Sequence, residues 1–256
     1  MKSGIVKHLF KSFLYDILDI DDTGSYGERL TEEELRISML FSKIHGEIVR
    51  NVYLPKENGE TSEIDVLFIT RKGILVIESK NYSGWIFGGE KDYYWTVCLP
   101  NKKRFKFYNP IMQNKGHIKW LKNYIGEKIP MFSVIAFSER CELKDVKVED
   151  KDIVVINRDE MNYTIRCFWD DNKDIISDEE VMELYNKLKV LTNVDEATRI
   201  KHINDIDKKV SKNLKICPIC NRELIVRTAK RGQHVGKKFY GCSGYPACKY
   251  TKDIDD

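Results

Sequence analysis

Two acids and a lysine stand near the ends of two short apolar runs, at a spacing that suits metal-dependent chemistry. Asp65 lies in the first run, and Glu78 and Lys80 end the second. If residues 71–72 form a two-residue turn, the runs pair as a hairpin in which Asp65 lies opposite Glu78. Opposed residues have Cβ atoms about 4.5 to 5.5 Å apart, so the two carboxylates repel. Lys80 projects on the same face as Glu78, because side chains alternate along a strand.

A divalent cation between the two carboxylates would relieve this repulsion. Oxygen ligands with open water positions suit Mg²⁺ or Mn²⁺. Such a cation activates water and neutralises charge in phosphodiester hydrolysis, while a nearby lysine orients the nucleophile or stabilises the same charge. A three-residue loop would shift the register by one and separate the acids. The plain alternative is a surface hairpin whose polar side chains face solvent.

The elements that must position these groups are read from apolar periodicity and from turn residues. A capping box of Thr31 and Glu34 predicts a helix from Thr31 to about Arg50. The pair Asn109-Pro110 predicts a helix to about Ile125, and a third helix is expected over 178–191. Short β-like runs lie at 52–54, 64–70, 74–80, 93–99, 105–108, 132–137 and 153–156. This mixture predicts an α/β (α+β) fold with a mixed sheet flanked by helices.

The first twenty residues have the pattern of an amphipathic helix, Gly4 to Ile20. Charged side chains interrupt its apolar residues, so neither a secretory signal nor a membrane span is supported. Three of the seven cysteines are scattered singly, which does not indicate disulfides. We therefore expect a cytoplasmic protein that does not enter a membrane.

Residues of about 42 to 125 resemble the nuclease-related domain, NERD, a branch of the PD-(D/E)xK nuclease superfamily. The resemblance follows, in order, Gly46-Glu47, Leu54-Pro55, Glu63-Ile64-Asp65, the run from Gly73 to Lys80, and Asn109-Pro110 followed by Gln113. It implies a restriction-endonuclease-like core in which Asp65, Glu78 and Lys80 form the metal site. It also implies that Glu47 and Gln113 act as auxiliary ligands or orienting groups. Family membership implies the fold more firmly than it implies cleavage.

Three further groups have both a functional and a plain interpretation. His117 lies four residues after Gln113 on the same helix face and could touch substrate, although packed or surface histidines are common. The cluster Lys102-Lys103-Arg104 could contact phosphates, yet adjacent charges in a turn are usually only solvated. The aromatic run 93–95 fits core and strand positions better than base-stacking positions.

Four cysteines near the C-terminus have the spacing of a metal site. Cys217 and Cys220 form one close pair, and Cys242 and Cys248 form a second pair after 21 intervening residues. Four thiolates satisfy tetrahedral Zn²⁺ in a closed site, which is structural and not catalytic. Because so short a segment cannot build a core alone, metal binding would supply its folding free energy.

The same segment resembles the zinc finger at the C-terminus of bacterial type I topoisomerases, through Cys-Pro-x-Cys, Phe239 to Ser243 and Tyr245 to Tyr250. That resemblance implies binding to single-stranded DNA. Residues from 211 onward carry ten Lys/Arg against four Asp/Glu, which suits a nucleic-acid partner. Basic groups would follow phosphates and aromatic rings would stack on bases, with some rings packing around the zinc instead. The predicted contacts are Arg227, Lys230, Arg231, Lys237, Lys238, Phe239, Tyr240, Tyr245, Lys249, Tyr250 and Lys252.

The sequence thus predicts four parts: an N-terminal helix and linker (1–30), a nuclease-like domain (31–192), a charged connector (193–213) and a four-cysteine zinc finger (214–256). The favoured function is a Mg²⁺- or Mn²⁺-dependent deoxyribonuclease whose finger holds single-stranded or duplex DNA. The main alternative is a DNA-binding protein that keeps the nuclease fold as a scaffold without cutting. A protein-interaction adaptor is a third. The sequence leaves open whether two chains cooperate.

Overall fold

The structure is a computed structural model that describes residues 23–42, 44–213, 217, 220, 222–229 and 235–254. The helix expected over 4–20 lies outside these residues. The chain divides into two compact units, Met1–Val194 and Asp195–Asp256. No helix in the described part of the chain is long and apolar enough to cross a membrane.

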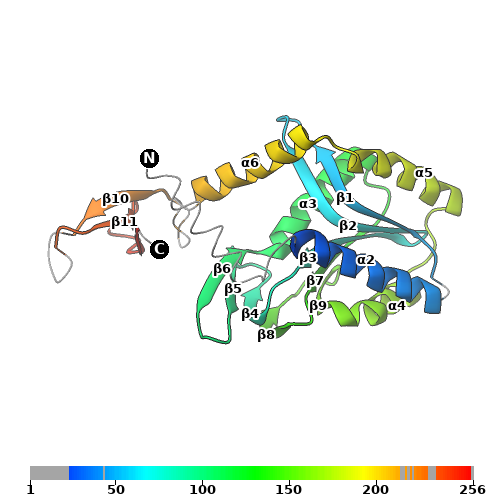
Figure 1. Ribbon diagram of the computed structural model, residues 1–256, viewed down its shortest axis with the longest axis horizontal. Helices are drawn as coiled ribbons and strands as arrows, with labels where there is room; N and C mark the ends of the chain where they lie inside the picture. Colours follow the sequence, from blue (N-terminus) through cyan, green and yellow to red (C-terminus); the bar gives the residue numbers. More distant parts are fainter. Residues whose placement is uncertain are drawn as a thin grey trace. The chain divides into compact units, whose positions relative to one another are not determined.

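The first unit is built on a five-stranded mixed sheet with the order β1-β2-β3-β7-β9 (Figure 1). Its strands are β1 (Glu47–Pro55), β2 (Thr61–Thr70), β3 (Gly73–Lys80), β7 (Met131–Phe137) and β9 (Ile153–Asn157). β1, β2 and β3 pair antiparallel, whereas β7 runs parallel to both β3 and β9. The central strands are nearly continuous apolar runs because both of their faces are covered.

Helices cover the two faces of this sheet. On one face, α2 (Thr23–Phe41) and α4 (Met161–Asp171) pack against side chains such as Phe68 and Ile77. On the other face, α3 (Pro110–Ile125) and α5 (Asp178–Lys189) pack against their neighbours Leu67 and Val76. Adjacent residues of one strand enter different cores because side chains alternate. The predicted mixed α+β fold is confirmed.

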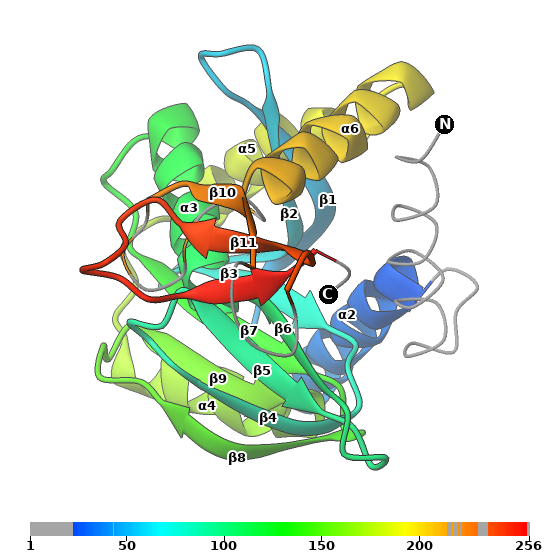
Figure 2. The ribbon, with the colours of Figure 1, turned by 90° about the vertical axis from the view of Figure 1, so that its left-hand side faces the viewer.

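A second, four-stranded sheet has the order β6-β5-β4-β8, and Figure 2 shows β5, β4 and β8 side by side. Its strands are β4 (Gly84–Gly89), β5 (Tyr94–Cys98), β6 (Arg104–Tyr108) and β8 (Cys141–Lys147). One face is buried through Ile86, Trp95 and Val97, which pack with Phe137 of β7 and Ile111 of α3. This sheet therefore lies directly beside the strand and helix ends that hold the candidate site.

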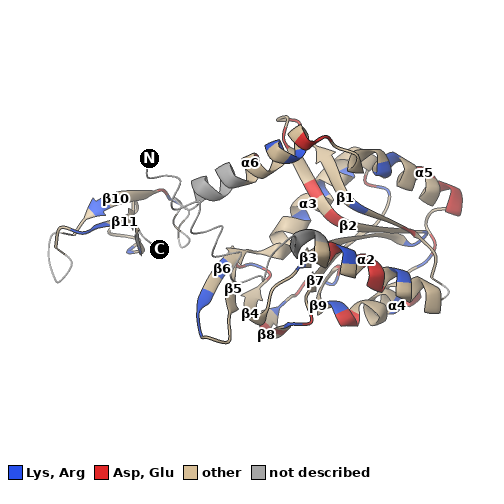
Figure 3. Ribbon diagram, in the orientation of Figure 1, with Lys and Arg blue, Asp and Glu red and all other residues tan. Residues whose placement is uncertain are grey.

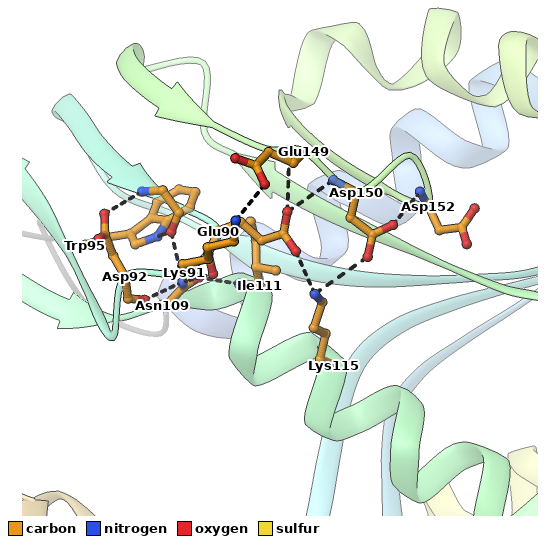
Figure 4. A network of polar contacts seen from close by, with 11 residues as sticks. Glu90, Lys91, Asp92, Trp95, Asn109, Ile111, Lys115, Glu149, Asp150 and Asp152 are labelled. Atoms are coloured by element: carbon orange, nitrogen blue, oxygen red, sulfur yellow. Dashed lines mark hydrogen bonds and ion pairs between the residues drawn. The ribbon is translucent and has the colours of Figure 1, made fainter. Parts of the chain in front are cut away.

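Polar contacts fix this second sheet to the start of α3 (Figure 4). Asn109 caps the helix by accepting from the Ile111 N–H at 2.9 Å, and its amide donates to the carbonyls of Gly89, Glu90 and Asp92. Lys115, one turn further along α3, pairs with Glu90 at 2.8 Å. The N-cap predicted at Asn109 is thus also the junction between α3 and the β4–β5 turn.

The helix predicted from Thr31 to about Arg50 is displaced in the structure. α2 begins at Thr23 and ends at Phe41, and β1 begins at Glu47. Thr31 is buried in the middle of the helix, where its hydroxyl donates to the carbonyl of Gly27 at 3.0 Å. A threonine with glutamate three residues later is therefore not a cap here, because the helix has already started eight residues earlier.

In the first unit, two strands and one α-helix were not predicted: β4, β8 and α4. β4 carries three glycines in six residues, and β8 has charged residues at most of its exposed positions, so neither has the composition of a strand. The segment expected to be a charged connector, 193–213, is largely the helix α6 (Glu196–Asn213). Its second half is charged, and a charged sequence forms a helix as readily as a linker.

The second unit also contains a small three-stranded sheet of β10 (Leu224–Thr228), β11 (Lys238–Cys242) and β12 (Thr251–Asp253). Its buried cluster consists of Cys217, Leu224, Cys242 and Cys248. A core of this size is too small to hold a fold without a covalent or metal crosslink.

Candidate functional site

The β2–β3 hairpin has the register that brings the two acids together. Val66 pairs with Ile77 and Thr70 pairs with Gly73, so the connection is the two-residue turn 71–72. Asp65 and Glu78 are the next residues beyond the last ladder pair, on opposite strands. The predicted two-residue connection is confirmed, and the acids lie at the open end of the hairpin.

The turn at the closed end is anchored, which fixes this register. Lys72 donates to the carbonyls of Trp169 and Asn172 at 2.5 and 2.7 Å, at the end of α4. The Arg71 carbonyl accepts the N–H groups of Ile175 and Ile176. A slip by one residue would break these contacts and would turn the apolar side chains of β3 to the wrong face.

Glu78 is almost fully buried, with an ammonium hydrogen-bonded to one carboxylate oxygen and an imidazole close to the other. The Lys80 ammonium lies 2.6 Å from Oε1, and His117 Nε2 lies 3.2 Å from Oε2. Gln113 Oε1 accepts from Lys80 Nζ at 3.1 Å. The structure therefore brings Gln113 of α3 into the same cluster as Glu78 and Lys80 of β3.

Asp65 faces the same cluster from β2. Its Oδ2 accepts the backbone N–H of Ser79 at 2.8 Å. Burial, and then the neighbouring charge of Glu78, raise the pKa of Asp65 well above its usual range, while Lys80 acts in the opposite direction. The repulsion that the sequence predicts between the two acids is present in the folded protein.

The pKa values of the two acids are shifted in opposite directions. Burial disfavours the Glu78 carboxylate, yet Lys80 and His117 more than offset this and hold its pKa at about 2. Burial also acts against the Lys80 ammonium, but Glu78 raises the pKa of that group above its usual value. Glu78 and Lys80 thus form a charged pair, whereas burial and the charge of Glu78 disfavour the ionised form of Asp65.

Glu47 does not join this cluster. It is the first residue of β1, where it pairs with Ile69. Ile69 lies four positions from Asp65 along β2, a separation of about 13 Å at 3.3 Å per residue. The role predicted for Glu47 depended on a helix reaching residue 50, and this helix ends at Phe41.

Glu28 of α2 takes the place expected of Glu47. Burial, and then the charge of Glu63, raise its pKa to about 7, with Glu78 adding to the effect. Its Oε2 is buried and has no hydrogen-bond partner among the described residues. The same Gly-Glu pair occurs at 27–28 and at 46–47, so the choice between them depended on where the helix lies.

His117 and Ser62 complete the surroundings of Glu78. The sequence favoured a packed or surface histidine at 117 over a substrate contact. His117 is buried and lies against Glu78, and Ser62 Oγ is 2.8 Å from its other ring nitrogen. The only signal for His117 was its position one turn after Gln113. Nothing in the sequence pointed to Ser62.

The four cysteines of the second unit form one cluster, as predicted. Their Sγ atoms lie within 4.8 Å of one another, and this is the only group of three or more metal-ligating side chains found among the described residues. The Sγ atoms of Cys217 and Cys248 are 3.6 Å apart, and those of Cys220 and Cys242 are 3.3 Å apart. Zn–S bonds of about 2.3 Å in a tetrahedron separate the sulfurs by about 3.8 Å, so this set fits Zn²⁺.

The thiols differ in how readily they ionise. The Arg222 backbone N–H lowers the pKa of Cys220 to about 7, whereas burial raises the pKa of Cys242 to about 12. A cation is what would keep the buried Cys242 as a thiolate.

The predicted nucleic-acid contacts of the zinc finger differ in their exposure. Tyr240 and Tyr250 pack against the cysteine cluster, as expected for some of the rings. Tyr245 is 60% exposed, and the Arg227 guanidinium lies 5.5 Å from the centre of its ring. Lys237, Lys238 and Lys249 are exposed, Phe239 and Lys252 are half-buried, and Lys230 and Arg231 lie outside the described residues.

The fold and the site define a class of protein. Its first unit is a mixed α+β domain with two acids and a lysine at the end of a hairpin, and its second unit carries four clustered cysteines that fit a metal ion. Residues 23–138 match the nuclease-related domain, NERD, and residues 215–256 match the topoisomerase DNA-binding C4 zinc finger. The chain is also 33% identical over 189 residues to the uncharacterized protein pXO1-01 of Bacillus anthracis, covering 74% of this chain and 86% of that protein. The protein belongs to the NERD family.

Two DNA topoisomerases match the zinc finger region. That of Mycoplasma genitalium is 50% identical over 36 residues, and that of Methanocaldococcus jannaschii is 43% identical over 47 residues. These matches cover 14% and 18% of this chain and only 5% and 6% of the topoisomerases. No solved structure matches the chain.

Proposed function

We propose that this protein is a Mg²⁺- or Mn²⁺-dependent nuclease that hydrolyses phosphodiester bonds of DNA, and that its zinc finger holds the DNA. The observation that carries the proposal is the cluster at the hairpin end. Asp65, Glu78 and Lys80 come from neighbouring strands in the register that faces the acids toward one another. Membership of a nuclease-related family supports the same activity.

The residues present fit a divalent cation. Asp65 and Glu78 place two buried carboxyl groups beside a single ammonium, and burial together with the charge of Glu78 raises the pKa of Asp65, which supports a site for an added cation. Carboxylate oxygens are the ligands that Mg²⁺ and Mn²⁺ prefer. When bound there, the cation would supply activated water and neutralise charge on the phosphate.

The side chains around the acids have separate tasks. Lys80 lies where it can donate to a phosphate oxygen, and Gln113 holds Lys80 by accepting one of its hydrogens. His117 fixes the orientation of Glu78 through Oε2. Glu28 replaces Glu47 as the auxiliary acid, because it reaches the cluster from α2 and its carboxyl group, with a pKa of about 7, can hold or release a proton near neutral pH.

The zinc finger supplies the contacts that hold DNA. Tyr245 presents an exposed ring, and Lys237, Lys238 and Lys249 are exposed cations that can follow phosphates. Stacking on an exposed aromatic ring contributes about 1 to 3 kcal/mol per base and tolerates any base. Single-stranded DNA suits such a surface, since its bases are free to stack.

The test is to incubate the purified protein with single-stranded, nicked and duplex DNA, with Mg²⁺ or Mn²⁺ added or withheld. We expect cleavage that requires the added metal and that falls at least about 100-fold in Asp65→Ala. Glu47→Ala should cut at close to the normal rate, whereas Glu28→Ala should be impaired. If the normal protein shifts DNA in gels but cuts none of the substrates with either metal, the non-cleaving scaffold is the correct function.

A further inference from the structure

A row of cations follows the edge strand of the second sheet. Lys102, Lys103, Arg104 and Lys106, named here the β6 basic edge, lie on β6 and on the turn that precedes it, and all four side chains are exposed. Figure 3 shows the corresponding blue stretch on β6. β6 is the outermost strand of the order β6-β5-β4-β8, so no strand of the described residues pairs with this edge.

The four cations have no acidic partners within the described part of the chain, which sets them apart from basic residues on nearby elements. Lys115 pairs with Glu90, and Lys144 and Lys147 of β8 pair with acids on their own strand. Neutralised cations contribute little to an external field, whereas four adjacent unpaired ones make a local excess of positive charge. The β6 basic edge thus attracts a polyanion.

The backbone beneath these cations is held in one conformation. The two phenylalanines that alternate with the exposed residues of β6 are half-buried and pack into the core of the second sheet. In the preceding turn, Lys102 N–H donates to the Leu99 carbonyl and Lys103 N–H donates to the Asn101 side chain. The cations therefore project from a fixed strand, which reduces the entropy lost when they bind.

This edge is joined directly to the candidate active site. Phe107, next to Lys106, has its ring 4.7 Å from that of Tyr82, measured between centroids. Tyr82 lies two residues beyond Lys80 and is close enough for the Lys80 charge to act on its hydroxyl. At the other end, β6 leads through Asn109 into α3, which carries Gln113 and His117. The strand that carries the β6 basic edge is thus packed, through its buried face, against the segment that follows Lys80 and leads directly into the helix of Gln113 and His117.

Exposed aromatic rings mark the end of the edge nearest to α3. Tyr108 and Tyr93 are 39% and 37% exposed, and their ring centroids lie 5.3 Å apart at 69°. Tyrosine rings beside unpaired cations are a surface that suits a nucleic acid better than an acidic protein, because the rings can contact sugars and bases. From the sequence alone, the cations were expected to be a solvated turn and the aromatic residues 93–95 to occupy core positions. Of these three aromatic residues, only Trp95 is fully buried.

We propose that the β6 basic edge binds the phosphate backbone of duplex DNA and guides it to the cluster of Asp65, Glu78 and Lys80. The inference rests on the nuclease function proposed above and adds a second DNA contact, separate from the zinc finger. Because it concerns binding, it is tested in protein that cannot cut.

The experiment measures the affinity of full-length Asp65→Ala protein for a short blunt duplex over a range of salt concentrations. The test variant adds Lys102→Ala, Lys103→Ala, Arg104→Ala and Lys106→Ala. A matched control instead removes three lysines and one arginine that are also exposed and unpaired among the described residues but lie on other elements: Lys128, Lys151, Arg166 and Lys173.

Each phosphate contact contributes about 0.9 to the slope of log affinity against log salt for duplex DNA. Loss of the β6 basic edge should lower the slope by about 2 to 4, with the control variant close to the parent protein. An equal loss in both variants, or no change in the test variant, would overturn the inference. If the protein with Asp65 intact cleaves DNA while the test variant keeps the full slope, the nuclease function stands without this contact.

Discussion

Replacing Glu28 by glutamine tests the environment that the structure gives to the auxiliary acid. Glu28 projects from α2, and burial is the largest cause of its raised pKa, followed by the charge of Glu63. Glutamine keeps the shape of the side chain and cannot ionise. The substitution therefore removes the cost of the charge and leaves the packing in place.

The size of the effect follows from the pKa. The pKa of Glu28 rises from 4.5 to about 7 on folding. A pKa difference of 1 corresponds to about 1.4 kcal/mol, so the ionised carboxylate costs about 3 kcal/mol above pH 7. Below pH 4.5 the carboxyl group is protonated in both the folded and the unfolded protein, so it carries no such cost. As the pH rises from 4.5 through 7, ionisation of Glu28 lowers the free energy of unfolding. Glu28→Gln should therefore stabilise the protein at pH 8 by about 2 to 3 kcal/mol more than at pH 5.

The assay is urea unfolding at pH 5 and pH 8 without added divalent cation, followed by tryptophan fluorescence. All four tryptophans lie before residue 195, so the signal reports the first unit alone. Glu33→Gln is the matched control, because Glu33 is on the same helix and its side chain is 55% exposed. Equal changes at the two pH values, or a Glu28→Gln protein that is less stable at pH 8, would refute the environment assigned to Glu28.

Three other substitutions test the packing around the site and the metal module. Asn109→Ala should lower the free energy of unfolding by about 3 kcal/mol, because three carbonyls and one N–H lose their partner in a buried position. Urea titration would measure this loss, and a loss below about 1 kcal/mol would contradict the prediction. Gly88→Ala should cost about 3 kcal/mol, since its Cβ would lie 2.3 Å from the Trp95 ring; a melting temperature equal to that of the parent protein would show that this contact is misplaced. Cys242→Ser should release zinc, measured as metal per chain, and should leave the tryptophan-detected unfolding of the first unit unchanged; a global loss of stability would show that the two units do not fold independently.

Local sequence signals predicted the hairpin and α3 well. The run from Ile74 to Lys80 and the turn at 71–72 specify strand, turn and strand, and the register follows from them. Asn109-Pro110 supplies both a capping side chain and a first-turn proline, so the start of α3 was fixed to the residue. These features depend on neighbours within a few positions of one another, which is the range over which sequence patterns are informative.

The prediction for Glu47 failed because it required knowledge of how distant segments pack. Thr31 and Glu34 match a capping box, but the buried contact of Thr31 with Ser79 of β3 shows that the residue is a packing position within α2. Glu28 reaches the acids only because α2 lies across the sheet. His117 likewise touches Glu78 because α3 covers β3, an arrangement that no local pattern contains.

The sequence by itself predicted the cluster of four cysteines, and it predicted that Asp65 and Glu78 face each other if the hairpin turn has two residues, since each prediction depends on spacing along one or two adjacent elements. Only the tertiary structure placed Glu28 near Asp65, brought His117 of α3 to Glu78, and left the cations of the β6 basic edge without acidic partners among the described residues. The physical reason is that burial and charge pairing arise between residues far apart in the chain, and these are the two effects that set the ionisation of an acid.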